Sequence, residues 1–347
     1  FEWDRNIYDS NDWGGRNPGQ PFFMQVQLHG GKHRGQVPSK AWQNQVRWQL
    51  GSNTNPGDVL LPPYYPRDPI ILQDWAEYLD CCRWTDKEVG EVIARLEREK
   101  ILDQTVVFFM TDHGISHARG KQFLYDEGIR IPFIVRGPGI AQGMTRNDLI
   151  EHIDMATTSL VLAGISIPAW MQGKNIISRD YRVREAVFAA RDRCDETMDR
   201  IRCVRTTDHK YIRNYMPQRP HLQPCEYKDE KAIIRRLREL HSNGKLDALT
   251  EKLLFSPSRP PEELYDLAAD PFETTNLADD PRHRPLLATM RQRLATWEEK
   301  TGDRGRTPES MERYDSDMAV YLNGNNQSKA KLKSNIEQNK QWAKEGK

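Results

Sequence analysis

A short polar segment near the middle of the sequence carries residue types that could bind a metal ion and an anion. It begins with Asp112 and His113, directly after the apolar run at residues 105–110. A carboxylate and an imidazole at the end of a strand can both face one metal ion, and Gly114 lets the backbone turn sharply after them. Three basic side chains follow on the same loop, namely His117, Arg119 and Lys121. A lysine in this position can supply a point charge to an anionic substrate. Taken alone, the Asp-His pair is also typical of a solvated strand end.

The elements around this segment predict a doubly wound α/β domain with a mostly parallel sheet flanked by helices. Apolar runs at residues 21–28, 105–110 and 131–135 have the length and composition of buried strands. Between the first two, apolar residues recur at spacings of three and four over residues 72–96, which predicts a long helix. Another helix is expected at residues 154–163. In such domains the chemistry gathers beyond the carboxyl ends of the strands, where the polar segment lies.

The pattern changes after about residue 196. Short alternating segments at residues 202–205, 210–213 and 263–267 predict a small antiparallel sheet, and residues 282–299 predict a helix with one apolar side. We therefore expect an α/β domain at residues 1–196 and a smaller α+β domain at residues 197–301. Residues 302–347 are predicted to form a polar C-terminal extension.

Composition excludes some classes of function. The charges of the 51 basic and 50 acidic side chains nearly cancel, so the protein has no overall positive potential that would favour nucleic acid as a partner. No apolar run approaches the roughly 20 residues that a membrane-spanning helix needs. The five cysteines show no CxxC spacing that would indicate a metal or redox site.

Several motifs in unbroken order resemble the type I sulfatases of the alkaline phosphatase superfamily. They are the Thr-Asp-His-Gly turn, the Gly120-Lys121 pair and the segments 124–128 and 131–139. Upstream, the run 21–23 with the loop 29–34 and the helix around residues 84–90 are also similar. Downstream, residues 263–267, 270–271 and 276–277 look like the closing strand and turn of these proteins. The resemblance spans about residues 20–285. Within the family, the sequence most resembles the heparan N-sulfatase-like and arylsulfatase-like members.

The resemblance implies an alkaline phosphatase-like fold and a set of roles. Asp112 and His113 would be ligands of a divalent cation, and Lys121 would hold a sulfate oxygen in catalysis. One basic residue of the loop 29–34 would contact the leaving group. The candidates are His29 and His33 as catalytic residues and Lys32 as a substrate-binding residue, with His117 and Arg119 as further substrate-binding residues. Ca²⁺ is the metal expected from the family, while the imidazole ligand makes Mn²⁺, Mg²⁺ or Zn²⁺ alternatives.

An arginine-rich stretch extends the possible substrate site. Residues 179–213 contain nine arginines interleaved with acidic residues. The stretch could be a surface laced with ion pairs, or it could recognise sulfate or carboxylate groups on a polyanionic sugar. Arg191, Arg193 and Glu196 are the candidates for the second role. The expected substrate is accordingly a sulfated carbohydrate or an aryl sulfate.

The nucleophile of the family is not found in this sequence. Sulfatases use a cysteine or serine oxidised to formylglycine within a short motif, and none of the five cysteines lies in such a motif. We expect the motif in an N-terminal segment of the same protein, without which this chain would be inactive. The family also implies a periplasmic, secreted or lysosomal-type compartment. Two alternatives remain: a phosphate or phosphonate ester hydrolase of the same superfamily, and a non-catalytic remnant that binds sulfated glycans.

Overall fold

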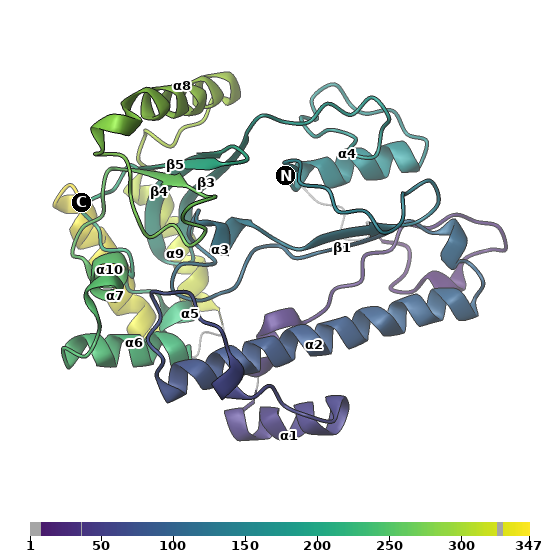
Figure 1. Ribbon diagram of the computed structural model, residues 1–347, viewed down its shortest axis with the longest axis horizontal. Coiled ribbons are helices and arrows are strands. Elements are labelled where there is room, and N and C mark those ends of the chain that lie inside the picture. The colour runs from purple at the N-terminus through teal and green to yellow at the C-terminus, as the bar shows by residue number, and fades with distance from the viewer. Residues whose placement is uncertain (1–7, 36, 325–328) are drawn as a thin grey trace.

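The computed structural model describes residues 8–35, 37–324 and 329–347. In Figure 1 a long helix, α2 (Pro69–Arg98), runs along one side of the molecule, and strand β1 (Val107–Met110) lies between it and helix α4 (Ile153–Leu162). A four-stranded sheet with its own covering helices occupies the other end. Within the described parts of the chain, no helix combines the length and the apolar composition needed to cross a bilayer.

Helix α2 confirms the helix predicted from the spacing of apolar residues. It begins after Asp68, whose side chain accepts a hydrogen bond from the amide of Ile70 at 2.9 Å, and Pro69 occupies its first turn. Both features stabilise a helix N-terminus. Its buried residues include Ile71 and Trp75, which pack in one core with helix α6 (Ala232–Ser242). Helix α2 thereby joins the first third of the chain to the region after residue 220.

Of the mostly parallel sheet predicted for the first domain, the described residues contain one pair of strands, and that pair is not parallel. Strand β1 pairs with β2 (Phe133–Arg136), and the two are antiparallel, with Phe108 opposite Val135. The strand predicted at residues 21–28 is wrong: no regular strand is assigned there, and most of its side chains are at least partly exposed. An extended segment becomes a strand only when a neighbour pairs with its backbone, and no described strand does so here.

The antiparallel sheet predicted after residue 196 is confirmed. Its four strands follow chain order: β3 (Val187–Cys194), β4 (Thr197–Arg205), β5 (His209–Asn214) and β6 (Glu262–Asp266). Asp195, in the turn between β3 and β4, adopts the left-handed backbone conformation with a φ of 52°. Asp tolerates that conformation better than most residues, so it suits a tight turn between two strands.

Helix α8 covers one face of this sheet, and residues 123–125 pack against the other. Helix α8 (Arg284–Thr301) packs Leu287, Met290 and Leu294 against Val204 and Tyr211. The other helices and turns are α1 (Ser39–Leu50), α3 (Asp126–Ile129), α5 (Glu226–Asp229), α7 (Ala248–Thr250), the π-helical turn Glu251–Phe255, and the 3₁₀ turns Trp13–Gly15, Gly30–Gly35, Pro56–Asp58, Leu102–Gln104 and Pro281–His283.

The polar C-terminal extension folds back onto the sheet. Helices α9 (Met311–Asn323) and α10 (Lys329–Lys344) bury Tyr314, Met318, Leu332 and Ile336 around Met198 of strand β4. Two asparagines on one face of α10 add polar contacts. Asn335 donates to the Glu196 carboxylate at 2.7 Å, and Asn339 accepts from the Met198 amide at 3.2 Å. The extension is therefore packed against the start of β4 through both apolar and polar side chains.

Candidate active site

Asp112 and His113 lie together where strand β1 ends. The His113 Nε2 atom is 3.5 Å from a carboxylate oxygen of Asp112. The Nδ1 atom of His113 lies 2.7 Å from the carbonyl oxygen of Gly114, which can only accept, so Nδ1 carries the proton. The lone pair of the ring is then on Nε2, which is buried and has no hydrogen-bond partner among the described residues. This pair fits two of the ligands that a divalent cation needs.

The backbone after this pair leaves no room for a side chain at two glycines. A Cβ atom on Gly114 would meet the carbonyl oxygen of Glu127 at 2.0 Å, and one on Gly120 would meet that of Ile115 at 1.8 Å. The amide of Lys121 donates to the same Ile115 carbonyl at 2.7 Å. The loop between the two glycines is therefore tightly closed, and it fixes the backbone position of Lys121.

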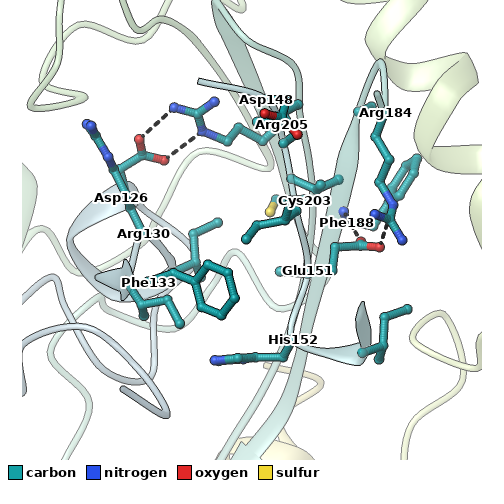
Figure 2. Close-up of a pocket in the computed structure, with 18 of the residues that line it drawn as sticks. Asp126, Arg130, Phe133, Asp148, Glu151, His152, Arg184, Phe188, Cys203 and Arg205 are labelled. Carbon is teal, nitrogen blue, oxygen red and sulfur yellow. Dashed lines mark hydrogen bonds and ion pairs between the residues drawn. The ribbon is translucent and has the colours of Figure 1, made fainter. Parts of the chain in front are cut away.

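An open cavity of about 2620 Å³ lies beside these residues. Figure 2 shows part of its lining, with Arg205 paired to Asp126 and Arg184 paired to Glu151. The structure brings five of the predicted site residues to the lining of this one cavity, namely Asp112, His113, Lys121, Arg191 and Arg193. They come from the end of β1, the following loop and strand β3. A carboxylate–imidazole pair, a lysine and two arginines around one cavity can accommodate a substrate with several anionic groups.

Sequence reasoning missed other polar side chains that line the cavity. Burial raises the pKa of the Asp126 carboxyl, but Lys210 and Arg205 lower it more, so that its pKa is about 2. His152 donates from Nε2 to the carbonyl of Thr111 at 3.0 Å, next to Asp112 and His113 in the chain. These partners are 41 to 84 residues apart in sequence, and no local spacing marks them.

His117 and Arg119 were predicted to bind substrate, but the structure buries both. The His117 Nε2 atom lies 3.0 Å from Asp74 Oδ1 and 2.9 Å from Arg34 Nη2. Burial lowers the pKa of His117 to about 4, although Asp74 opposes the shift. The guanidinium of Arg119 stacks 3.8 Å from the centre of the Tyr125 ring and donates to the Glu273 carbonyl. Their side chains are at most 1% exposed, so we do not retain them as substrate ligands.

The three candidates from the arginine-rich stretch differ in their surroundings. Arg191 is buried, donates to the Gln122 carbonyl at 2.7 Å and lies 3.5 Å from Asp199. Arg193 forms an ion pair with Asp317 of helix α9. The third candidate, Glu196, is 1% exposed, and one carboxylate oxygen accepts from the Glu226 amide and from Asn335. Glu196 thus has structural contacts and does not line the cavity, whereas both arginines do.

The basic loop 29–34 forms a separate cluster. The rings of His29 and His33 are 4.8 Å apart, and His33 Nε2 lies 3.6 Å from a carboxylate oxygen of Glu88 on α2. One ligand atom from each of these three residues lies within 4.8 Å of the others. Neither histidine nor Lys32 lines the cavity, so the arrangement does not support the predicted contact with a leaving group.

Comparisons with known proteins agree with the resemblance seen in the motifs. The family model described as "Sulfatase" matches residues 3–165, and the model described as "N-sulphoglucosamine sulphohydrolase, C-terminal" matches residues 113–253. The two overlap at the loop that carries Lys121. Together they cover both the β1 region and the first three strands of the antiparallel sheet.

Individual relatives agree with the family models. An ulvan-active sulfatase of Formosa agariphila is 34% identical over 252 residues, covering 72% of this chain and 42% of the relative. Human N-sulphoglucosamine sulphohydrolase is 25% identical over 313 residues, covering 86% of this chain and 60% of the relative. The solved structure of a 2-O GAG sulfatase shares the fold, with a TM-score of 0.50 and 21% identity over 84% of this chain and 56% of the other. The chain spans less than two thirds of the length of these curated relatives.

Proposed function

The chain belongs to the sulfatase family, and on that premise we propose that it forms part of an enzyme that hydrolyses sulfate esters, or N-sulfate groups, of a sulfated carbohydrate. The observation that supports this proposal most directly is that Asp112, His113 and Lys121 all line one cavity. Two arginines on the same lining, Arg191 and Arg193, favour a substrate with more than one anionic group. The names of the relatives, which include ulvan-active and glucosamine-directed sulfatases, favour the same substrate class.

Each residue at the cavity has a distinct task in this proposal. Asp112 and His113 would hold a divalent cation, Ca²⁺ first and Mn²⁺, Mg²⁺ or Zn²⁺ as alternatives, which when bound would polarise a sulfate oxygen. Lys121 would bind another oxygen of the sulfo group and offset the charge that develops on the departing oxygen. Asp126 and Arg205 form a fixed ion pair in the lining and keep the cavity polar.

The formylglycine nucleophile is proposed to lie outside the 347 residues of this sequence. Two observations support that part of the proposal. The matched region covers only 42% of the ulvan-active relative, so more than half of that relative lies outside the match. Apolar side chains near the cavity are also exposed, with Ile134 of β2 at 62% and Met144 at 67%. Exposed apolar side chains of this size favour burial against further polypeptide.

Sulfate release from a panel of sulfated saccharides tests this proposal, using the native protein with any upstream segment that intact-mass analysis finds. Wild-type protein should release sulfate, Lys121→Met should lower the rate at least about hundredfold, and Lys245→Met should leave it unchanged. Lys245 is an exposed lysine after helix α6 and provides the matched control. Release of phosphate from phosphate esters without release of sulfate would instead assign the chain to another hydrolase activity. Saccharide binding without any release, in protein that contains formylglycine, would refute the proposal.

A further inference from the structure

Two histidines and one glutamate converge outside the cavity from two segments of the chain. His29 precedes the 3₁₀ turn Gly30–Gly35, His33 belongs to that turn, and Glu88 lies on helix α2. One ligand atom of each residue lies within 4.8 Å of the corresponding atoms of the other two. None of the three residues lines the large cavity, so this cluster is separate from the pair at the end of β1.

The backbone of the turn brings the two imidazole rings together. Gly30 adopts the left-handed conformation, with a φ of 55°, and a backbone hydrogen bond of 3.2 Å to the His29 carbonyl closes the turn. The rings of His29 and His33 are consequently neighbours, with their centres 4.8 Å apart. The next side chain, Arg34, lies 3.5 Å from the Asp74 carboxylate and so ties the turn to helix α2.

Packing holds the ring of His33 towards Glu88. The ring centres of His33, Trp42 and Trp84 lie between 5.2 and 5.7 Å from one another, and Trp42 is 1% exposed. Glu88 follows Trp84 by one helical turn, so both side chains lie on the same face of α2. The His33 Nε2 atom is 3.6 Å from a carboxylate oxygen of Glu88. This imidazole and this carboxylate therefore form a largely preorganised pair.

The polar atoms of the pair lack partners of their own. His33 Nε2 and Glu88 Oε2 are both buried, and neither has a hydrogen-bond partner in the part of the chain that the structure describes. The lysine next to Glu88, Lys87, pairs with Glu91 at 3.8 Å instead. Burial lowers the pKa of His33, although Glu88 opposes the shift, so the ring is largely neutral at pH 7. A neutral imidazole leaves the charge of the carboxylate uncompensated, and a bound cation would compensate it.

We propose that His29, His33 and Glu88 form a binding site for a divalent transition-metal ion, with Zn²⁺ as its ligand. Two imidazoles and one carboxylate form a set of three protein ligands that Zn²⁺ accepts with one position left open, whereas Ca²⁺ and Mg²⁺ prefer oxygen ligands. The ligand atoms of a tetrahedral zinc site lie about 3.3–3.5 Å from one another. The 3.6 Å separation of His33 and Glu88 is close to this value, and the exposed His29 side chain can rotate towards them. The ion would join the turn to helix α2.

Calorimetric titration with ZnCl₂ tests the site, using protein that is stripped with EDTA and then dialysed. The Asp112→Asn variant is the reference, because it removes a ligand of the pair at the end of β1. It should bind Zn²⁺, and adding Glu88→Gln or His29→Gln should weaken that binding at least about tenfold, since each removes one of three ligands. Glu97→Gln changes an exposed glutamate of the same helix and should leave the affinity unchanged. Equal affinity in Glu88→Gln, or no zinc binding in the reference, would overturn the proposal.

A measurement on the wild-type protein covers the case in which a variant does not fold. Modification of individual histidines by diethyl pyrocarbonate, followed by peptide mass spectrometry, should slow at His29 and His33 when ZnCl₂ is added. The exposed His241 is the control and should react at the same rate. Unchanged rates at His29 and His33, or equal slowing by MgCl₂ at the same ionic strength, would overturn the site. Neither experiment uses sulfate release as its readout, so failure of the proposed function would leave this proposal standing.

Discussion

Replacing His117 by glutamine should make the protein less sensitive to acid between pH 6.5 and pH 4. His117 is fully buried, with the Trp75 ring 4.6 Å from its own and Asp74 and Arg34 at its Nε2 atom. Burial lowers its pKa from 6.5 to about 4 in the folded protein. The unfolded chain takes up a proton near pH 6.5 and the folded chain only near pH 4. Stability due to the neutral ring is therefore complete above pH 6.5 and is lost as the pH falls towards 4.

The size of the effect follows from the two pKa values. A pKa that falls from 6.5 to about 4, at about 1.4 kcal/mol for each tenfold change in proton affinity, gives roughly 3 kcal/mol of acid destabilisation at pH 4. That is a large part of the roughly 5–15 kcal/mol by which a typical domain is stable. Asp74 also contributes stability, but its contribution changes only below the range from pH 6.5 to pH 4. Burial raises the pKa of its carboxyl, but His117 and Arg34 lower it more, to about 2, so the stability it contributes is lost only below pH 3.8.

Urea denaturation followed by tryptophan fluorescence at pH 7, 5.5 and 4.5 measures the effect. His117→Gln should be less stable than the wild type at pH 7, because it loses packing and hydrogen bonds, and the difference should shrink by a few kcal/mol towards pH 4.5. His241→Gln is the matched control, since His241 is exposed at the end of helix α6. Curves for His117→Gln and the wild type that remain parallel over this range would refute the reasoning. They would restore His117 as an accessible candidate for substrate binding.

Three other predictions concern the cavity. Gly120→Ala should lower sulfate release at least about tenfold without unfolding the protein, because its Cβ would meet a carbonyl at 1.8 Å and displace Lys121. Gly90→Ala, whose Cβ would meet nothing within 4 Å, is the control, and circular dichroism reports whether each variant is folded. Arg193→Ala should raise KM of the complete enzyme more than it lowers kcat, and an unchanged affinity would reject this arginine as a substrate contact. Asp112→Asn should weaken the binding of added Ca²⁺ or Mn²⁺ at least about tenfold in calorimetry, and equal affinity would reject the metal pair.

Patterns of short range in the sequence predicted several elements correctly. The alternating segments at residues 202–205, 210–213 and 263–267 correspond to β4, β5 and β6, and the 3–4 spacing at residues 72–96 corresponds to α2. In each case the prediction depended on the spacing of apolar side chains and on flanking turn residues, and a short stretch of sequence contains both. The family resemblance was carried by motifs of the same short range, such as the turn at Asp112, and the family models support it.

Contacts between residues far apart in sequence could not be predicted in this way. The ion pair of Arg193 with Asp317 joins residues 124 apart, and the hydrogen bond of Asn335 to Glu196 joins residues 139 apart. Burial of His117 depends on α2, whose contact with the loop cannot be read from either segment alone. The strand expected at residues 21–28 failed for a related reason, because apolar composition indicates burial but does not supply a pairing neighbour.

The asparagine face of α10 has a consequence for how this protein could change over evolutionary time. Asn339 accepts hydrogen bonds from both the Met198 amide and the Arg219 guanidinium, which is fully buried. Loss of this helix, by an early stop codon or by proteolytic trimming, would remove an acceptor from both donors, although Arg219 would keep its hydrogen bond to the Met198 carbonyl at 2.9 Å. A buried donor left unsatisfied costs about 1–3 kcal/mol. The extension and strand β4 should therefore be inherited together, and lineages that shed the helix should also replace Arg219 with a smaller apolar residue.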